Sequence, residues 1–133
     1  MATTNDEARR AQLKSISETY FAGLAKRDVS SVPWHDDIVL RSPLAPEGLE
    51  VPLRGKSAVI QWFESLYPVF GETRVIEHYF NGSLTVIATR ADVGITEPPC
   101  FLRVVDRFTV NASGQITEQE NHYDPRPAIR PHS

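Results

Sequence analysis

The chain has 133 residues and a mass of 14.9 kDa, the size of one ordinary domain. This length excludes a TIM barrel, a large Rossmann enzyme or two independent catalytic domains. With 41% hydrophobic and 23% charged residues, the composition is that of a globular protein with one core. The 14 basic and 17 acidic side chains give a formal net charge of -3, so we expect no nucleic acid partner.

The chain contains one cysteine, Cys100, and charged residues interrupt its N-terminal stretch. A lone cysteine makes neither an internal disulfide nor a zinc site by itself, which is typical of a reducing compartment. No segment approaches the roughly 20 apolar residues that cross a bilayer, and we see no secretory signal. We therefore predict a cytoplasmic protein without a membrane partner.

Apolar residues in the first half of the chain recur at the spacing of a helical face. They predict a long amphipathic helix over 6–26, with Thr3 or Thr4 as its cap. A strand is predicted at 38–40, followed by a proline-rich loop. A second apolar face predicts a helix over 56–70.

The second half of the chain is strand-like, with turn residues at regular intervals. Four strands are predicted, over 73–80, 84–95, 101–110 and 115–123. We expect the tail, 124–133, to be irregular because it contains three prolines and no periodicity. Helices followed by antiparallel strands predict one α+β domain over 1–133, in which a curved sheet packs on the helices and leaves a concavity.

The last predicted hairpin gives a more specific expectation about side-chain directions. A four-residue turn at 111–114 would place Val110 opposite Gln115 and so fix the register. One face would carry the charged residues Arg103, Arg107, Glu118 and Glu120. The other face would carry Asp106, Phe108, Gln119, Asn121 and Tyr123. A few polar groups among apolar ones are typical of a small-molecule pocket, so we predict that the second face lines the concavity.

The sequence contains no motif for a cofactor or a metal. The segment 54–57 ends like a phosphate-binding loop, but Glu50 stands where that loop needs a glycine. The four histidines lack the spacing of metal ligands. We expect neither a cofactor nor a metal ion.

Asp106 is the candidate for chemistry in this hairpin. An aspartate between Val104 and Phe108 on an apolar face is costly to bury ionised, so we expect its pKa to be raised. A protonated carboxyl group can donate a hydrogen bond to a developing oxyanion, as in ketosteroid isomerase. The alternative is a structural role, in which the carboxylate accepts hydrogen bonds and orients the sheet.

Four segments carry a resemblance to a known group: 18–21 in the first helix, 34–37 before the first strand, 53–56 before the second helix, and 106–108. In their order the chain resembles the nuclear-transport-factor-2-like superfamily, which includes ketosteroid isomerases and SnoaL-like polyketide cyclases. The resemblance covers nearly the whole chain. It implies a cone-shaped α+β fold with a ligand cavity, and a homodimer formed through the outer face of the sheet.

The resemblance also assigns roles to single residues. Tyr20 falls where a ketosteroid isomerase has its oxyanion-hole tyrosine, and Asp106 falls where it has its neutral aspartic acid. The position of the proton-abstracting aspartate, just before a proline, is occupied by Ser42. A serine hydroxyl is too weak a base for that step. Tyr20 has the alternative role of a core tyrosine, because it shares a helical face with apolar residues.

His78 has two interpretations, a base facing the cavity or a buried, hydrogen-bonded histidine. The predicted substrate-binding residues are Ser42, Trp62, Phe108, Gln119, Asn121 and Tyr123. The leading hypothesis is an enzyme that uses acid/base chemistry on a polyketide-like or steroid-like molecule, as an isomerase, cyclase, dehydratase or hydratase. The alternative is a module of the same fold that binds a ligand or a protein without catalysis. Epoxide opening ranks below both because it needs an inward-facing arginine.

Overall fold

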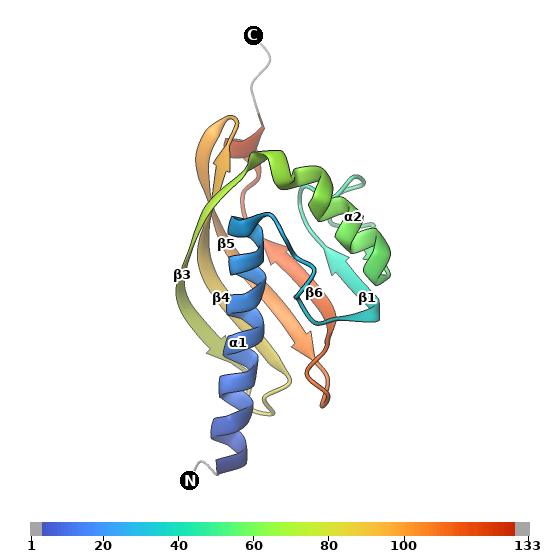
Figure 1. Cartoon of the computed structure of the whole chain (residues 1–133), viewed down its shortest axis with the longest axis vertical. Coiled ribbons are helices and arrows are strands. Elements are labelled where there is room, and N and C mark those ends of the chain that lie inside the picture. The colour runs from blue at the N-terminus through green and yellow to red at the C-terminus, as the bar shows by residue number, and fades with distance from the viewer. Residues whose placement is uncertain (1–3, 130–133) are drawn as a thin grey trace.

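The computed structural model describes residues 4–129 of the chain. Its elements, in chain order, are α1 (Thr4–Lys26), β1 (Trp34–Arg41), β2 (Leu53–Arg54), α2 (Lys56–Leu66), the 3-10 helix η1 (Tyr67–Val69), β3 (Phe70–Phe80), β4 (Val86–Thr96), β5 (Pro99–Val110), β6 (Ile116–His122) and the 3-10 helix η2 (Arg126–Ala128). Of the two caps proposed for the first helix, Thr3 lies outside the described residues. The predicted α+β fold is confirmed, with two α-helices against one curved sheet (Figure 1).

The six strands form one sheet in the order β2-β1-β6-β5-β4-β3. Strands β3 to β6 pair antiparallel as predicted, whereas β1 pairs parallel with β6, so the sheet is mixed. Helix α1 packs on β3 and β4, and α2 packs on β1 (Figure 1). The two helices therefore cover different halves of the same sheet face.

An aromatic cluster joins the helices to the sheet. The ring of Tyr20 on α1 lies edge-on to Phe63 on α2 and to Phe108 on β5, with ring centroids 5.8 Å and 5.2 Å away. Trp34 on β1 stacks on Phe63 at 5.4 Å. Edge-on and stacked rings of this kind stabilise a core beyond the area that they bury. The cluster fixes the position of Tyr20 relative to α2 and to the sheet.

Two element boundaries differ from the sequence prediction. Strand β1 begins at Trp34 rather than at residue 38. Residues 35–37 are polar and do not alternate as strand residues usually do, so the sequence did not predict this part of the strand. The pairing of β1 with β6 is irregular here, with a register shift between Trp34 and Val39. Helix α2 ends at Leu66 rather than reaching residue 70. Pro68 lacks the backbone N–H that an α-helix would use, and the chain goes on as the 3-10 helix η1.

The register of the last hairpin differs from the predicted one. The loop has five residues, Asn111 to Gln115, so Val110 lies opposite Ile116, and the pairing shifts again between Thr109 and Val110. Asn111 stabilises the longer loop, because its Oδ1 accepts hydrogen bonds from the backbone N–H groups of Ser113 and Gln115 at 3.1 Å and 2.9 Å. Gly114 takes the left-handed conformation that the loop requires, with a φ of 84°.

The register error spans two residues along most of the hairpin, so it leaves the facing of each side chain unchanged. Asp106 lies opposite Asn121 rather than Gln119, and Phe108 lies opposite Gln119 rather than Thr117. These side chains are buried, whereas Arg107 pairs with Glu118 at 2.6 Å and Glu120 at 3.2 Å on the outer face. The predicted division into an inner and an outer face is thus retained.

Candidate functional site

A cavity of about 310 Å³ lies between the helices and the inner face of the sheet. Its walls are mostly apolar and include Leu24, Leu66, Val69, Val93, Leu102 and Val104. Five lining residues bring a hydroxyl, carboxyl or amide group: Tyr20, Glu97, Asp106, Asn121 and Tyr123. A mostly apolar pocket with a few polar groups is the general form of a small-molecule site.

Strand alternation places Asp106 in the cavity wall. Leu102, Val104 and Asp106 occupy alternate positions of β5, and all three line the cavity. Asp106 is 2% exposed, and among the residues that the structure describes its Oδ1 has no hydrogen-bond partner. Burial raises the pKa of this carboxyl group well above its ordinary value. The neutral acid is therefore favoured, and it carries an O–H donor.

Tyr20 is the second candidate donor. It is 2% exposed and projects from α1 into the cavity lining. Burial raises the pKa of its hydroxyl group well above the ordinary value, and ionisation of Asp106 would raise it further, whereas hydrogen bonding by Gln119 partly opposes the rise. The phenol keeps its proton and faces the same cavity as Asp106.

Buried polar residues behind this wall form a chain. The indole Nε1 of Trp34 donates to Oε1 of Gln119 at 3.0 Å, and Nε2 of Gln119 donates to Oδ1 of Asn121 at 3.1 Å. Trp34, Gln119 and Asn121 are each 3% exposed or less. Asn121 lines the cavity, whereas Gln119 and Trp34 lie behind it. Gln119, a predicted ligand-binding residue, therefore lies outside the cavity lining.

Ser42 and Tyr123 form a second buried pair. Their hydroxyl oxygens are 3.1 Å apart, and Tyr123 lines the cavity while Ser42 does not. Burial raises the pKa of Tyr123 to about 12, although its hydrogen bond with Ser42 acts in the opposite direction. Ser42, predicted as a ligand-binding residue, is fully buried behind Tyr123.

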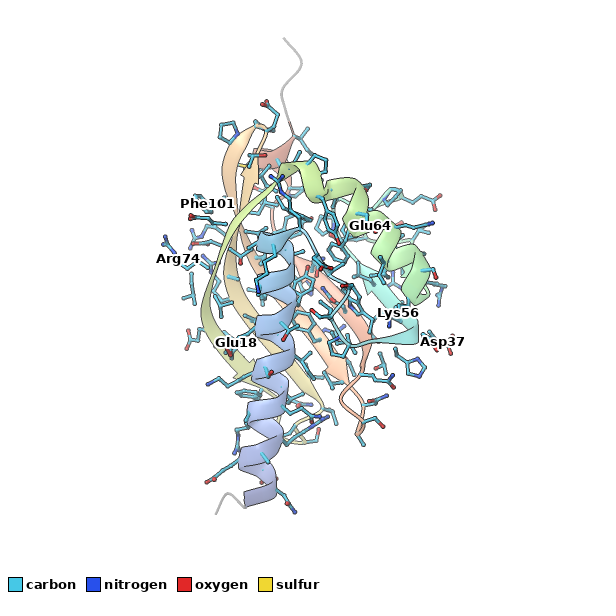
Figure 2. All side chains as sticks on the ribbon, viewed as in Figure 1. Glu18, Asp37, Lys56, Glu64, Arg74 and Phe101 are labelled. Carbon is cyan, nitrogen blue, oxygen red and sulfur yellow. The ribbon has the colours of Figure 1, made fainter. Side chains whose placement is uncertain are left out.

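The other candidates from the sequence separate into two groups. Trp62 lines the cavity, as predicted for a ligand-binding residue, whereas Phe108 lies behind the lining and packs on Tyr20. His78 lies outside the cavity lining, between β3 and α1. Its Nδ1 is 2.8 Å from Oγ1 of Thr89, and its Nε2 is 3.9 Å from Oε1 of Glu18. Figure 2 labels Glu18 on α1, beside β3.

The hydroxyl group of Thr89 connects His78 to Ser17, since its Oγ1 is 2.6 Å from Oγ of Ser17. Thr89 and Ser17 are fully buried, and burial lowers the pKa of His78. The geometry is closer to the second interpretation of His78, since the histidine is hydrogen-bonded and half-buried.

Sequence reasoning missed one polar residue of the lining, Glu97. It connects β4 to β5, and it is exposed, so it lies at the mouth of the cavity. In the sequence prediction this residue falls between the strands over 84–95 and 101–110. The sequence signal that could have indicated Glu97 is a carboxylate at the tip of a hairpin beside the predicted concavity. The tail also contributes, because Ala128 of η2 lines the cavity, and no pattern in the sequence indicated this.

The described part of the chain offers no metal site, because residues 4–129 hold no cluster of three His, Cys, Asp or Glu side chains. Neither described α-helix combines the length and the apolar character needed to cross a membrane. The polar groups of the cavity are thus carboxyl, hydroxyl and amide groups, and these can bind, orient and exchange protons with a ligand.

Residues 17–119 match the family model of the SnoaL-like domain. No curated protein sequence matches the chain. Among solved structures, an NTF2-like protein from Anabaena variabilis is similar with a TM-score of 0.74 and 16% identity, over 93% of this chain and 95% of that one. A steroid delta-isomerase from Pseudomonas aeruginosa is similar with a TM-score of 0.68 and 21% identity, over 88% of this chain and 82% of that one.

A computationally designed 17-OHP binder is also similar, with a TM-score of 0.71 and 21% identity, over 85% of this chain and 94% of that one. At these identities the likeness to the solved structures shows the fold. An enzyme and a designed binder share that fold, so it leaves the choice between catalysis and binding to the residues of the cavity.

Proposed function

Because the chain belongs to the SnoaL-like domain family, we propose that its cavity binds a small apolar molecule and performs acid/base chemistry on it. The reaction classes that suit the cavity are isomerisation, cyclisation, dehydration and hydration. The apolar walls support an apolar, polyketide-like or steroid-like ligand. The names of two structural neighbours, a steroid delta-isomerase and a 17-OHP binder, favour the same ligand class.

The observation that carries this proposal is the buried Oδ1 of Asp106, which has no partner among the described residues. An unpartnered buried carboxyl group is costly, so its persistence in a cavity wall favours a role toward a ligand. Asp106 and Tyr20 would both donate to an oxygen on which negative charge develops. Preorganised donors of this type contribute about 3–4 kcal/mol each to transition-state stabilisation.

The proton acceptor is proposed to be Glu97, the other carboxyl group of the lining. In an isomerisation its carboxylate takes the proton from the carbon beside a carbonyl group, and the electron pair passes to the carbonyl oxygen. Asp106 and Tyr20 stabilise that oxygen. Return of the proton to a different carbon then completes the reaction, and Glu97 is a carboxylate again.

Binding without catalysis is the second candidate, and the positions of two residues favour it. Ser42 occupies the place of the expected base and is engaged with Tyr123, while His78 lies outside the cavity lining. A binding module would hold its ligand with the same donors and leave it unchanged. Catalysis by this chain therefore depends on Glu97, and binding does not.

We further propose that the chain forms a homodimer through the outer face of β3 to β5. Tyr79, Phe101 and Val105 are 51%, 55% and 37% exposed, and Phe101 projects away from the helices in Figure 2. The three side chains share one sheet face, on which Arg103 separates Phe101 from Val105. Large apolar side chains on an exposed face favour an interaction surface. The same face carries the paired charges of Arg107 with Glu118, which can form the polar rim of an interface.

Turnover of a β,γ-unsaturated bicyclic ketone, followed by the absorbance of the conjugated product, tests the catalytic proposal. Asp106→Leu should abolish turnover, and Asp106→Asn should reduce it. The matched control is Asp37→Asn, because Asp37 is exposed on β1 and projects away from the cavity (Figure 2). Equal turnover by wild type and Asp106→Leu contradicts the role of Asp106. Ligand binding without turnover by wild type supports the binding module.

A further inference from the structure

The buried chain from Trp34 through Gln119 to Asn121 has a defined hydrogen-bond direction. An indole nitrogen can only donate, so the Gln119 atom 3.0 Å from Trp34 Nε1 must be the amide oxygen. The other end of the Gln119 side chain is then the NH₂ group. That group is 3.1 Å from the Asn121 side chain, which must accept through its own oxygen.

This direction determines what Asn121 presents to the cavity. Its Oδ1 accepts a hydrogen bond from Gln119, and no other described residue bonds to its NH₂ group, so this group is left for a ligand in the cavity that Asn121 lines. Asp106 lies directly opposite Asn121 in the β5–β6 pairing. Side chains opposite each other on one sheet face are close neighbours. The NH₂ group of Asn121 and the protonated carboxyl group of Asp106 therefore lie side by side on the cavity wall.

We propose that Trp34 is a positioning residue that sets the hydrogen-bond polarity of the cavity through Gln119, so that Asn121 donates to a carbonyl oxygen of an otherwise apolar ligand. This inference rests on the proposed function, because it assumes that the cavity holds such a ligand. The proposal restricts the ligand class to compounds whose buried polar atom accepts hydrogen bonds, since Tyr20, Asp106 and Asn121 would all donate.

Packing holds the chain of side chains in this direction. Trp34 is 1% exposed and stacks on Phe63 with an interplanar angle of 12°, which restrains rotation of the indole. Gln119 is fully buried. A reversed Gln119 amide would place NH₂ against the indole N–H and oxygen against the oxygen of Asn121. Two buried donors or two buried acceptors facing one another are strongly unfavourable. The indole donor of Trp34 therefore fixes the orientation of the Gln119 amide, and Gln119 in turn fixes the orientation of the Asn121 amide.

The test compares the binding of two probes of one shape, the ketone 1-tetralone and the hydrocarbon tetralin, measured by calorimetry. Wild type should bind the ketone about tenfold more tightly than the hydrocarbon. Trp34→Phe removes the indole donor and keeps an aromatic ring beside Phe63. Gln119→Met breaks the chain, and Asn121→Leu removes the terminal donor. All three variants should reduce the ketone preference to about threefold or less, with similar affinity for tetralin.

A spectroscopic signature separates positioning from a merely structural role. Donation to the bound ketone lowers its carbonyl stretching frequency, and this shift should be smaller in Trp34→Phe than in wild type although Trp34 does not line the cavity. Gln61→Met is the matched control for Gln119→Met, because Gln61 is exposed on α2. It should keep both the ketone preference and the carbonyl shift.

Three results would overturn the inference. If Trp34→Phe and Gln119→Met keep the wild-type ketone preference and carbonyl shift, Trp34 does not set the polarity, and the proposed function stands. If these variants weaken both probes equally, their role is structural only. If wild type binds neither probe, the proposed function fails and the inference fails with it. Should Trp34→Phe not fold, as judged by thermal unfolding, Gln119→Met and Asn121→Leu carry the same comparison.

Discussion

Asp106 on β5 and Asn121 on β6 are direct partners across the strand pair, and both side chains line the cavity. One is a buried carboxyl group without a hydrogen bond to its Oδ1 from the described residues, and the other is an amide whose oxygen is already engaged. The pair therefore brings two donor groups to one place on an apolar wall. A ligand oxygen at that place would provide the hydrogen-bond partner that residues 4–129 do not give to this carboxyl group.

The first prediction concerns the pH dependence of stability. Burial raises the pKa of Asp106 in the folded state, so above about pH 4, the ordinary pKa of an aspartate, the folded state binds more protons than the unfolded state. Stability should then fall as the pH rises from about 4 toward the folded-state pKa, by about 1.4 kcal/mol per unit of pH in that window. Asp106→Asn should lack this dependence.

Urea unfolding of wild type and Asp106→Asn at several pH values from 4 to 8 measures the effect. The variant should gain stability relative to wild type as the pH rises. Asp37→Asn serves as the control, because this exposed carboxylate is outside the cavity. Parallel stability curves for wild type and Asp106→Asn would show that the carboxyl group of Asp106 is not held neutral by burial.

The second prediction separates catalysis from binding at Glu97. Glu97→Gln keeps the shape of the side chain and removes the proposed proton acceptor, so kcat should fall by about 10²–10⁴-fold with little change in ligand affinity. Steady-state kinetics and calorimetry on the same ketone measure the two effects. The control is Glu64→Gln, since Glu64 is exposed on α2 (Figure 2). An unchanged kcat in Glu97→Gln means that another group accepts the proton.

The inner face of the site was predictable from the sequence because strand alternation survives an error of register. The predicted pairing of Asp106 was wrong by two residues, and Asp106 and Asn121 still face the same side. One residue of the error came from the five-residue loop that Asn111 stabilises, and the second came from the register shift between Thr109 and Val110. No pattern in the sequence indicated either.

Contacts between distant segments were beyond such reasoning. Trp34 and Gln119 are 85 positions apart, and only the parallel pairing of β1 with β6 brings them together. Hydrophobic periodicity describes which side of an element is buried, and it carries no information about which element lies opposite. Glu97 escaped attention for the same reason, because a loop reaches the cavity mouth only through the curvature of the whole sheet.

The third prediction concerns the buried polar group of Ser17, Thr89 and His78. Thr89→Val replaces the central hydroxyl group with a methyl group and leaves the buried Ser17 and the half-buried His78 without this partner. The free energy of unfolding should fall by about 1–3 kcal/mol.

Because His78 lies outside the cavity lining, His78→Gln should keep ketone turnover near the wild-type value.

Denaturant unfolding of Thr89→Val and a turnover assay of His78→Gln measure these two effects. Thr117→Val is the control for Thr89→Val, since Thr117 is half-buried in the last hairpin and lies apart from His78. Loss of turnover in a folded His78→Gln variant would restore His78 as a candidate base, contrary to its position between β3 and α1.

The last prediction concerns the proposed homodimer. Phe101 is 55% exposed on β5 and shares the outer face with Val105, with Arg103 between them, and a central aromatic side chain typically carries much of the energy of an interface. Phe101→Glu places a charge in that face and should weaken dimerisation at least about tenfold, because a desolvated, unpaired carboxylate is costly.

Val51→Glu is the matched control, since Val51 is exposed in the loop before β2. Sedimentation velocity over a range of concentrations should show dimers for wild type and Val51→Glu, and monomers for Phe101→Glu. Identical sedimentation of all three proteins would place any self-association elsewhere, and the apolar outer face would then need a different partner.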